Sequence, residues 1–378
     1  MKVPSKKTII VVCVLLLFSI PTVFRVFSIR KHVALDKYYQ YPKFPQLKFT
    51  RFFSKNTQEK TISDNLMWYY FSMSGYSELL IPLYLGIKNY ILNISPYPGK
   101  VVLGRKGWLF LGDEYSYVIS ESKGLINFSE KELQRIQDNL SKTQEYCRRR
   151  NIRFYLAIAP DKSDVYGCYL PIEKADRLTK LDQIRSRLSK CDFRMIDLGK
   201  NFKHFRNRIL YLKTDSHWNN LGLFIGYKTL MKEIRIDFPD IPILHLNQFI
   251  VDSVEDYSGD LADMISLRIK SQKLTLTPIF QSKAVIEKNR LALPKNYPYD
   301  PSLYEHRYFN KNRRYKTLVI HDSFFATISD FMKENFKESV FLWSYFDYNL
   351  IDREIPDIII YEIAEREVDV LLKQHVVL

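Results

Sequence analysis

The sequence predicts an α/β domain with a mainly parallel sheet and helices on both of its faces. Short, largely apolar runs at 154–159, 317–320 and 357–361 have the length and composition of buried parallel strands. Segments with helical periodicity separate these runs. With 378 residues the chain can bury a large core, and strand–helix alternation of this kind is typical of a parallel sheet.

The N-terminal residues predict a membrane anchor. Residues 8–24 form one apolar run of about 17 residues, the lower limit for spanning a bilayer, with basic residues on both sides. No small-residue cleavage site follows it, so we expect an uncleaved anchor in residues 1–30. Residues 31–98 are irregular, aromatic and interrupted by prolines, which predicts a stalk and packing arm. The domain itself is expected at 99–378.

Within this domain the first elements follow from local signals. The run 100–111 contains two short strand-like pieces around Gly104 and Gly107, which predicts a hairpin. Ser129 and Glu132 form a capping box that predicts a helix start. One face of that helix is expected to carry Leu133, Ile136, Leu140 and Cys147.

The later elements are predicted by the same patterns. We expect a helix at 175–189, strands at 194–198 and 209–212, a helix at 221–234, one helical turn within 257–264, an antiparallel excursion at 271–284 and a loop at 289–316. Beyond Ile320 we expect an amphipathic helix that buries Phe325, Ile328, Phe331 and Phe336. Strands at 339–343 and 357–361 then complete the sheet.

The net charge of +15 favours an anionic partner. Neither a zinc finger nor another recognisable nucleic-acid motif is present, and the basic residues are spread along the chain. A basic surface suits an anionic polysaccharide or a membrane surface equally well. Cys147, Cys168 and Cys191 match no zinc-binding spacing. The sequence therefore predicts neither nucleic-acid binding nor a zinc site.

The segment 213–220, KTDSHWNN, contains the first candidate catalytic residues. Asp215 and His217 follow a predicted strand, and Ser323 follows another. Ligand sites in parallel sheets lie beyond the carboxyl ends of the strands, so the fold can bring these residues together. Ser323 would be the nucleophile, His217 its general base and Asp215 the carboxylate that orients the imidazole. The Ser323 N–H, at a helix start, would face a developing oxyanion.

Other interpretations of these residues stay open. An Asp-x-His pair is short enough to arise by chance, and a serine before a helix is more often an N-cap than a nucleophile. Asp215 and His217 could also begin a metal site. Such a site needs a third ligand, and neither His204 nor His245 falls in a recognised pattern. We predict neither a metal nor another cofactor.

Six motifs occur in order and together resemble one family. They are GRKGWLFLGD (104–113), APDKSDVY with LP (159–171), TDSHWN (214–219), SGDL (258–261), HDSF (321–324) and PDIIIYEIAER (356–366). This set resembles the alginate O-acetyltransferase family, also called the DHHW group. Its members are membrane-anchored or periplasmic proteins with an SGNH-hydrolase-like, flavodoxin-like fold and a permuted motif order.

The resemblance implies a function and partners. In that family the D-x-H-W motif supplies the Asp and His, and a later G-D-S-F motif supplies the Ser, which correspond here to Asp215, His217 and Ser323. The family transfers acetyl groups to exopolysaccharide hydroxyls outside the cytoplasm, usually supplied by a multi-span membrane acyltransferase. We therefore expect an anchored periplasmic O-acetyltransferase. The rivals are an acetylesterase with the same triad and a silent polysaccharide-binding scaffold.

One position departs from the family pattern, because His321 stands where the family has Gly. It could narrow the site or compete with His217 as the base, although its place at a strand end would point it away from Ser323. Other residues that could shape the site or contact substrate are Asp161, Lys162, Trp218, Asp322, Glu362 and Arg366. For Trp218 we favour packing over a sugar platform. Glu362, Glu365 and Arg366 could alternatively form a surface ion cluster.

Overall fold

The computed structural model describes residues 82–172, 177–191, 193–205, 208–267, 269–290 and 304–373. The chain divides into two compact units, one through Pro96 and one from Tyr97 onward. The predicted anchor and most of the predicted stalk lie outside the described residues, so both stay predictions. Among the helices of the described ranges, none is long and apolar enough to cross a membrane. Of the first unit, the structure describes a short helical segment that ends in a π-turn at Ile87–Ile91.

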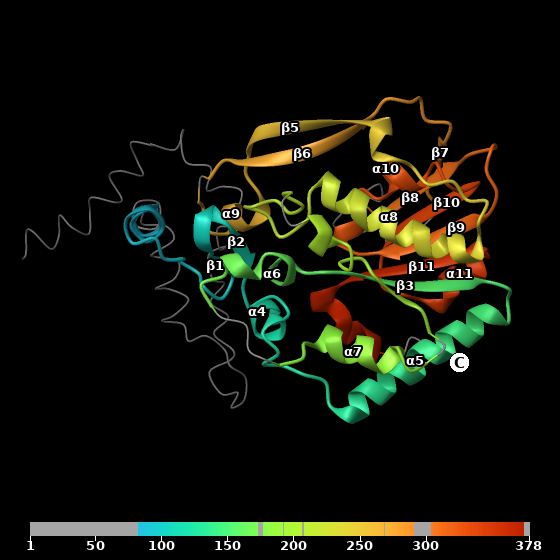
Figure 1. Cartoon of the computed structure of the whole chain (residues 1–378), viewed down its shortest axis with the longest axis horizontal. Helices are drawn as coiled ribbons and strands as arrows, with labels where there is room; N and C mark the ends of the chain where they lie inside the picture. Colours follow the sequence, from blue (N-terminus) through green and yellow to red (C-terminus); the bar gives the residue numbers. More distant parts are fainter. Residues whose placement is uncertain are drawn as a thin grey trace, which may run out of the picture. The chain divides into compact units, whose positions relative to one another are not determined.

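A seven-stranded sheet forms the centre of the second unit, as far as the described residues show (Figure 1). Its order is β4 (Met195–Asp197), β3 (Arg153–Ala159), β11 (Ile358–Ala364), β9 (Lys316–His321), β10 (Glu338–Trp343), β8 (Glu305–Phe309) and β7 (Val285–Glu287). The pairs from β4 to β10 are parallel, and β8 and β7 are antiparallel to their neighbours. The predicted mainly parallel sheet is confirmed.

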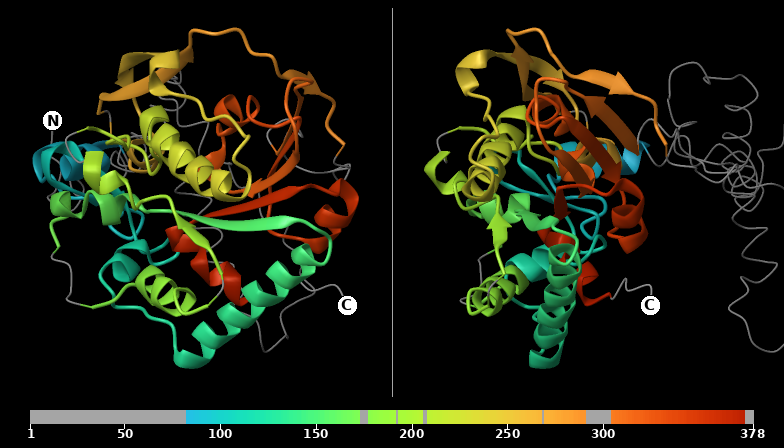
Figure 2. Two further views of the ribbon diagram at one scale, coloured as in Figure 1. Left: turned by 45° about the vertical axis from the view of Figure 1, so that its right-hand side comes forward. Right: turned by 90° about the vertical axis from the view of Figure 1, so that its right-hand side faces the viewer.

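Helices cover both faces of this sheet, as predicted. α5 (Glu130–Arg148) and α7 (Lys180–Leu188) lie on one side, with α11 (Tyr348–Glu354) and the 3-10 helix η9 (Glu365–Leu372). α8 (Asn220–Asp237) and α10 (Ser329–Met332) lie on the other (Figure 2). Strand β3 shows how both sides are filled. Tyr155 and Ala157 enter the core beneath α8, while Leu156 and Ile158 enter the core beneath α5, as the two-residue period of a strand requires.

The predicted starts of α5 and α8 are confirmed, whereas the helix predicted at 175–189 begins only at Lys180, in α7. Ser129 caps α5 by accepting a hydrogen bond from the Glu132 N–H, and the Glu132 carboxylate accepts one from the Ser129 N–H. Asn219 caps α8 through the N–H groups of Leu221 and Gly222, each at 3.0 Å. A side chain at Gly222 would place its Cβ 2.4 Å from the Leu210 carbonyl oxygen, so α8 can lie this close to the preceding segment only with glycine there.

Strand β8 lies inside the segment that the sequence predicts as a loop, so this prediction is wrong for 305–309. The strand carries charged residues where a buried strand is expected to be apolar. Arg307 is 2% exposed and donates hydrogen bonds to Glu354 at 2.6 and 2.8 Å and to Glu305. These charges are tolerated because they are paired. A buried ion cluster of this kind has no periodic signature in the sequence.

Two antiparallel pairs lie outside the main sheet. The predicted hairpin is confirmed as β1 (Val101–Leu103) and β2 (Leu109–Leu111). The predicted excursion is confirmed as β6 (Ser271–Pro278), which pairs with β5 (Phe249–Tyr257). Strand β5 was missed, since residues 250–256 are exposed and show no buried period. This ribbon ends at Tyr257, just before the predicted helical turn α9 (Asp260–Met264).

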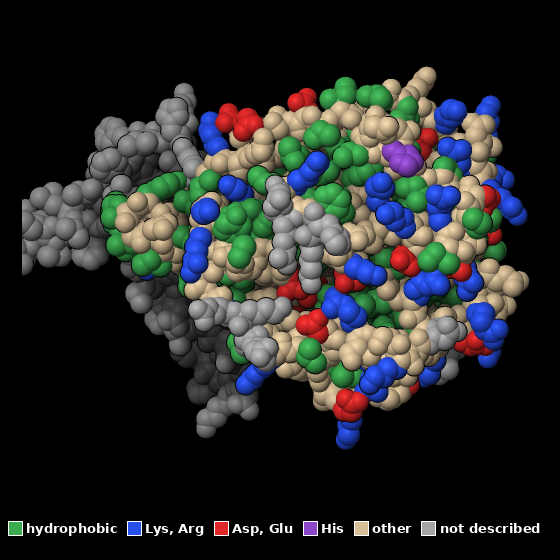
Figure 3. All heavy atoms as spheres, viewed as in Figure 1, with side chains coloured by type: hydrophobic (Ala, Val, Ile, Leu, Met, Phe, Trp, Pro, Cys, Tyr) green, Lys and Arg blue, Asp and Glu red, His purple; other side chains and the backbone are tan. Residues whose placement is uncertain are grey.

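Basic side chains are distributed over the surface. On the face shown in Figure 3, Lys and Arg side chains are scattered among acidic, apolar and uncharged groups and do not gather into a single patch. The high net charge therefore does not mark one binding surface on this face.

Candidate active site

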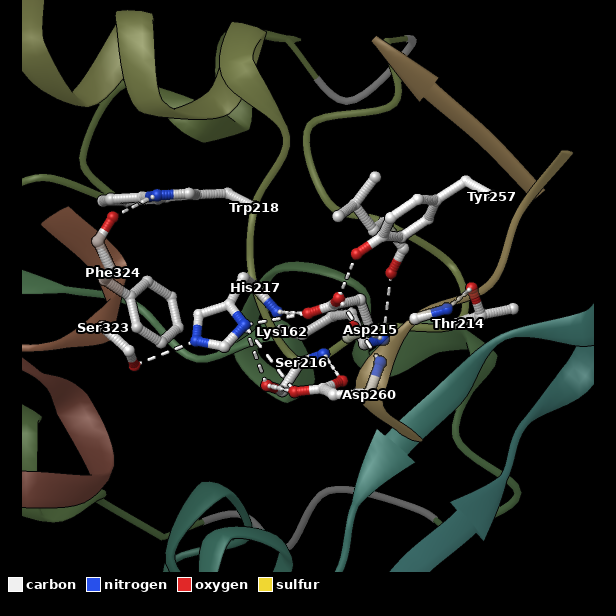
Figure 4. A network of polar contacts seen from close by, with 12 residues as sticks. Lys162, Thr214, Asp215, Ser216, His217, Trp218, Tyr257, Asp260, Ser323 and Phe324 are labelled. Carbon is white, nitrogen blue, oxygen red and sulfur yellow. Dashed lines mark hydrogen bonds and ion pairs between the residues drawn. The ribbon is translucent and has the colours of Figure 1, made fainter. Parts of the chain in front are cut away.

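Asp215, His217 and Ser323 lie in hydrogen-bonding contact (Figure 4). The His217 Nδ1 atom is 2.8 Å from Asp215 Oδ1, and its Nε2 atom is 2.9 Å from Ser323 Oγ. With Nδ1–H donating to the carboxylate, Nε2 can accept the serine proton. The His217 side chain is 30% exposed, so the imidazole is open to a substrate. The arrangement is that of a nucleophile, a base and an orienting carboxylate.

The loop that carries Asp215 and His217 does not follow a strand, and this part of the sequence prediction is wrong. In place of the expected strand at 209–212, the structure has a single bridge between Tyr211 and Trp218. Leu210, Tyr211 and Leu212 are all buried, so their apolar character comes from packing and not from a place in the sheet.

Lys162 binds the backbone of this loop. Its ammonium group donates hydrogen bonds to the carbonyl oxygens of Leu212, Lys213 and Asp215 at 3.1, 3.3 and 2.6 Å. The side chain is 4% exposed, so Lys162 is not at the mouth of the site. Burial lowers its pKa to about 7, and the charges of Asp260 and Asp215 act against this shift. Three carbonyl acceptors favour the charged form, which can donate to all of them. Lys162 therefore positions the loop that carries Asp215 and His217.

Both oxygens of Asp215 are hydrogen-bonded. Oδ1 accepts from the backbone N–H of His217 at 3.0 Å as well as from its ring, and Oδ2 accepts from the Tyr257 hydroxyl at 2.6 Å. Burial alone would raise the pKa of this carboxyl. The hydrogen bonds from His217 and Tyr257 outweigh it and hold the pKa below its usual range. Asp215 therefore stays ionised while it orients the imidazole.

Sequence reasoning missed Tyr257, which reaches Asp215 from the end of strand β5. The signal that could have found it is the neighbouring SGDL motif. A Cβ atom at Gly259 would lie 2.5 Å from the Asp215 Cβ and 2.5 Å from the Thr214 carbonyl oxygen, so only glycine lets the two segments meet. The hydroxyl of Tyr257 could not be assigned without knowing that the ribbon folds back to the loop.

A second carboxylate, Asp260, lies beside the imidazole. It accepts hydrogen bonds from the Ser216 N–H at 2.7 Å and the Ser216 hydroxyl at 2.6 Å, and its Oδ2 is 3.7 Å from His217 Nδ1. Ligand atoms of Asp215, His217 and Asp260 lie within 4.8 Å of one another, which is close enough to surround a metal ion. Hydrogen bonds already occupy these carboxylates, and the imidazole bridges Asp215 and Ser323. The geometry favours a hydrogen-bonded network over a metal site.

Ser323 begins a short 3-10 helix, η8 (Ser323–Phe325), directly after β9. The predicted long amphipathic helix is wrong, because η8 and the four-residue α10 take its place. The four apolar side chains expected on it are nonetheless buried. A long helix dipole therefore does not act on Ser323. Its backbone N–H stands at the start of this short turn, a position from which it could donate to an oxyanion.

Asp322 holds the turn that presents Ser323. One of its carboxylate oxygens accepts the Phe324 N–H at 2.8 Å, and the other accepts the Ala364 N–H at 2.6 Å. Its own N–H donates to Glu362 Oε2 at 3.2 Å. Asp322 thus connects the nucleophile turn to strand β11 and positions Ser323 without contacting the imidazole.

His321 is the last residue of β9 and is 3% exposed. Its Nδ1 donates a hydrogen bond to the Asp322 carbonyl oxygen at 2.8 Å, and its ring centroid lies 6.4 Å from that of Trp343. The structure gives it no hydrogen bond to Ser323, so it does not compete with His217 for the serine proton in this arrangement. It holds the peptide plane whose N–H belongs to Ser323.

Burial of His321 predicts a loss of stability in acid. Burial lowers the pKa of its ring from 6.5 to about 4, against the smaller raising effects of the Asp322 carbonyl and charge, while His306 lowers it further. Between these values the unfolded chain binds a proton that the folded chain does not. The contribution of His321 to the free energy of unfolding is therefore fully present above about pH 6.5. It is lost as the pH falls towards 4, by up to about 3 kcal/mol.

His321→Gln is expected to remove this part of the acid sensitivity. Urea unfolding at about pH 7 and pH 4.5 would measure it, with the exposed His245→Gln as the control. Equal losses in the wild type and in His321→Gln would show that the ring does not titrate as its burial implies.

Trp218 is a packing residue. It is 5% exposed, its ring N–H donates to the Phe324 carbonyl oxygen at 2.7 Å, and its ring meets the Phe324 ring edge-on at 5.1 Å. Through these contacts with Phe324 it holds the turn that follows Ser323. It is too buried to serve as a sugar platform.

Arg366 and Asp161 form a buried ion pair next to the triad. The Arg366 Nη1 atom donates to Asp161 Oδ1 at 2.7 Å, and the guanidinium lies 4.9 Å from the centre of the Phe324 ring. Their side chains are 12% and 7% exposed. Glu362 lies inside β11 at 0% exposure, and Glu365 is also buried, accepting the Asp161 N–H at 3.1 Å. The alternative of a surface ion cluster is therefore wrong.

Removing one partner of the buried pair is expected to destabilise the fold. Arg366→Met leaves Asp161 buried without its cation, which should lower the free energy of unfolding by about 3–5 kcal/mol. Urea unfolding would measure this, and Arg148→Met, which breaks an exposed pair with Glu145, is the matched control with an expected change of about 0.5 kcal/mol or less. Adding Asp161→Asn should restore part of the loss. Equal effects of Arg366→Met and Arg148→Met would contradict the buried pair.

A cleft of about 400 Å³ lies beyond the ends of β9, β10 and β11. The residues that line it include Ser323, Glu362, Arg366, His321, Trp343 and Tyr345. For Ser323 the rule that places ligands at the carboxyl ends of parallel strands therefore holds. Ser323 thus lines a space large enough for a small ligand.

Comparison with known proteins places the chain in a family. The model of the family described as "SGNH hydrolase-like domain, acetyltransferase AlgX" matches residues 101–293, about half of the chain. The chain belongs to this family. The resemblance to alginate O-acetyltransferases is thereby confirmed, and the SGNH hydrolase-like fold with it. The matched range includes Asp215 and His217 and ends before Ser323, so the place of the serine in the site rests on the contacts described above.

The individual relatives share less than 30% of their residues with this chain over the matched regions. The probable alginate O-acetylase AlgJ of Pseudomonas aeruginosa is 28% identical over 189 residues, which are 47% of this chain and 44% of that protein. The chain thus matches less than half the length of this relative. The structure of Bacillus cereus PatB1 with a sulfonyl adduct is similar with a TM-score of 0.52 and 18% identity, over 73% of this chain and 100% of that one. At this identity the likeness shows the fold alone.

Proposed function

We propose that this protein transfers an acetyl group to a hydroxyl of an exopolysaccharide or other cell-surface glycan through an acyl-Ser323 intermediate. The observation that carries the proposal is the 2.9 Å contact between Ser323 Oγ and His217 Nε2, with Asp215 on the other ring nitrogen. Membership of an acetyltransferase family supports the acyl group and the transfer. The name of the relative AlgJ supports a polysaccharide acceptor.

In the first half-reaction His217 takes the Ser323 proton as Oγ attacks the carbonyl carbon of an acetyl donor. The negative charge moves to the carbonyl oxygen, where the Ser323 N–H can donate to it. His321 helps by fixing the Asp322 carbonyl at 2.8 Å, since that carbonyl and the Ser323 N–H share one peptide plane. Collapse of the intermediate expels the leaving group, which takes the proton from His217.

In the second half-reaction a glycan hydroxyl attacks the acetyl-serine. His217 takes the hydroxyl proton and returns it to Ser323 Oγ as the ester bond breaks, which leaves an acetylated glycan and a free serine. Asp215 keeps Nδ1–H directed at its carboxylate throughout, and Tyr257 and Lys162 keep Asp215 in place. Water in place of the glycan hydroxyl would make the protein an esterase.

The setting of the reaction is also part of the proposal. The apolar run at 8–24 supports an anchored protein whose domain lies outside the cytoplasm. Because acetyl groups must then cross the membrane, a multi-span membrane acyltransferase would supply them.

A transfer assay separates this function from its rivals. The protein would be incubated with a small acetyl ester, with and without an acceptor oligosaccharide, and both free acetate and acetylated sugar would be measured. The proposal expects acetylated sugar to form at the expense of free acetate. Acetate alone would indicate the esterase, and an absence of both products would indicate a binding scaffold.

A further inference from the structure

We propose that the cleft beside Ser323 is the acceptor subsite, in which a pyranose ring of the glycan stacks on Trp343 and Tyr345. This inference rests on the proposed function, because it names where the second substrate of the same serine binds. It assigns a binding role to residues that no sequence motif indicated.

The sheet places Trp343 next to the nucleophile. Trp343 is the last residue of β10 and pairs in register with His321 at the end of the parallel strand β9, two residues before Ser323. The Ser344 N–H donates to the His321 carbonyl oxygen at 3.2 Å, which extends this alignment beyond the strand. The indole and Ser323 therefore line the same cleft from neighbouring strand ends.

The aromatic side chains here are more exposed than their surroundings. Val340, Phe341 and Leu342 of β10 are 1–2% exposed, whereas Trp343 is 39% and Tyr345 is 64% exposed. Large aromatic surface left in water at the rim of a cleft is typical of a binding site. A flat ring with one polar atom offers an apolar face to the C–H groups of a sugar and leaves its polar edge for hydroxyls.

Polar groups from β11 and from η9 also line the cleft. Glu362 is fully buried, lines the cleft, and has an oxygen, Oε1, without a hydrogen-bond partner among the described residues. Arg366 also lines the cleft, and Asp161 occupies one of its guanidinium nitrogens. An apolar floor with a few convergent polar groups is the usual composition of a small-ligand site. The volume of about 400 Å³ falls within the usual range for such a site.

The charges in the cleft do not select a strongly charged ligand. The Asp322 carboxylate is held by two backbone N–H groups, and the Arg366 charge is balanced by Asp161. Burial raises the pKa of the Glu362 carboxyl well above its usual range, which favours its neutral form. Glu367 also lines the cleft and accepts a hydrogen bond from the Ser116 hydroxyl at 3.1 Å. Stacking and hydroxyl hydrogen bonds would therefore dominate recognition, which suits the rings of a neutral or uronic-acid glycan. A ring held on Trp343 would present its hydroxyl to the acetyl-serine and exclude the water that would otherwise hydrolyse it.

The test measures the partition of the acetyl-Ser323 intermediate, as the ratio of acetyl transfer to the sugar over hydrolysis by water. The wild type, Trp343→Ala and Trp343→Tyr would receive a small acetyl ester together with either neutral or mannuronate oligosaccharides. Trp343→Ala is expected to lower the ratio of transfer to hydrolysis about tenfold, whereas Trp343→Tyr keeps a stacking ring and should stay near the wild type. The ratio compares two fates of the same acyl-enzyme, so a change in the rate at which each variant forms that acyl-enzyme does not alter it. A ratio unchanged in Trp343→Ala would overturn the subsite.

Binding without catalysis separates this inference from the function on which it rests. Calorimetric titration of Ser323→Ala with the same oligosaccharides would measure affinity in a protein that cannot react. Weaker binding after addition of Trp343→Ala supports the subsite, even if the wild type proves unable to transfer acetyl groups. Binding of equal strength with and without the indole would overturn the subsite, whatever the fate of the acyl-enzyme.

Discussion

Ser323→Ala is expected to abolish acetyl transfer while leaving the fold intact. The change removes one oxygen, the proposed nucleophile Ser323 Oγ, which lies 2.9 Å from Nε2 of the proposed base His217. Losses of about 10⁴–10⁶-fold are typical when the nucleophile of such a triad is removed. The hydrogen bond to His217 contributes about 1 kcal/mol, so urea unfolding should change little. Turnover of an acetyl ester and acetylation of the glycan would both be measured.

The matched control is Ser344→Ala, because Ser344 lines the same cleft and its hydroxyl donates to the Tyr345 carbonyl oxygen at 3.1 Å. This variant should keep its activity within a few fold. A folded Ser323→Ala protein that still acetylated the glycan at the wild-type rate would show that the chain acts as a scaffold, and the enzyme proposal would be wrong.

Asp215→Asn is expected to reduce turnover by about 10³–10⁴-fold with little effect on the fold. The amide has nearly the shape of the carboxylate and can keep hydrogen bonds to Tyr257 and to the His217 backbone. It loses the negative charge that stabilises the imidazolium and that favours Nδ1–H as the tautomer. The measurement is the turnover number for an acetyl ester, compared with that of Asp263→Asn, an exposed carboxylate on the nearby helix α9. Equal turnover by the two variants would give Asp215 a structural role only.

The sequence predicted those parts of the fold whose signals are local. Apolar runs located strands β3, β9, β10 and β11, and a capping box located the start of α5. Strand β8 escaped detection because it buries a charged residue, Arg307, whose two glutamate partners are brought to it only by folding. Strand β5 escaped because both of its faces are largely exposed.

The candidate site shows the same division. Asp215, His217 and Ser323 could be named from their motifs, and the structure brings them together, although no strand leads to Asp215. What holds the loop in place is remote in sequence: the Lys162 ammonium beneath it and the Tyr257 hydroxyl beside it. Such contacts follow from tertiary folding, and neither composition nor spacing reveals them.

Position 321, where the family has glycine and this chain has histidine, also shows why the sequence alone could not define the whole site. His321 fills this position with a buried ring that hydrogen-bonds to the next carbonyl and packs near Trp343. From the sequence alone the residue could narrow the site, add a polar group or compete as a base. Its burial and its single hydrogen bond select a positioning role for the peptide before Ser323.

The most direct test of the central claim is to find the acetyl group on Ser323. Wild-type protein would be mixed with an acetyl ester, quenched in acid within the first turnover and digested, and the peptides would be mapped by mass spectrometry. We expect one acetyl group on the peptide that contains Ser323, its loss when acceptor oligosaccharide is added before the quench, and almost none in His217→Ala. Acetylated glycan formed without any acetyl group on Ser323, or with the acetyl group on another residue, would contradict the acyl-serine mechanism.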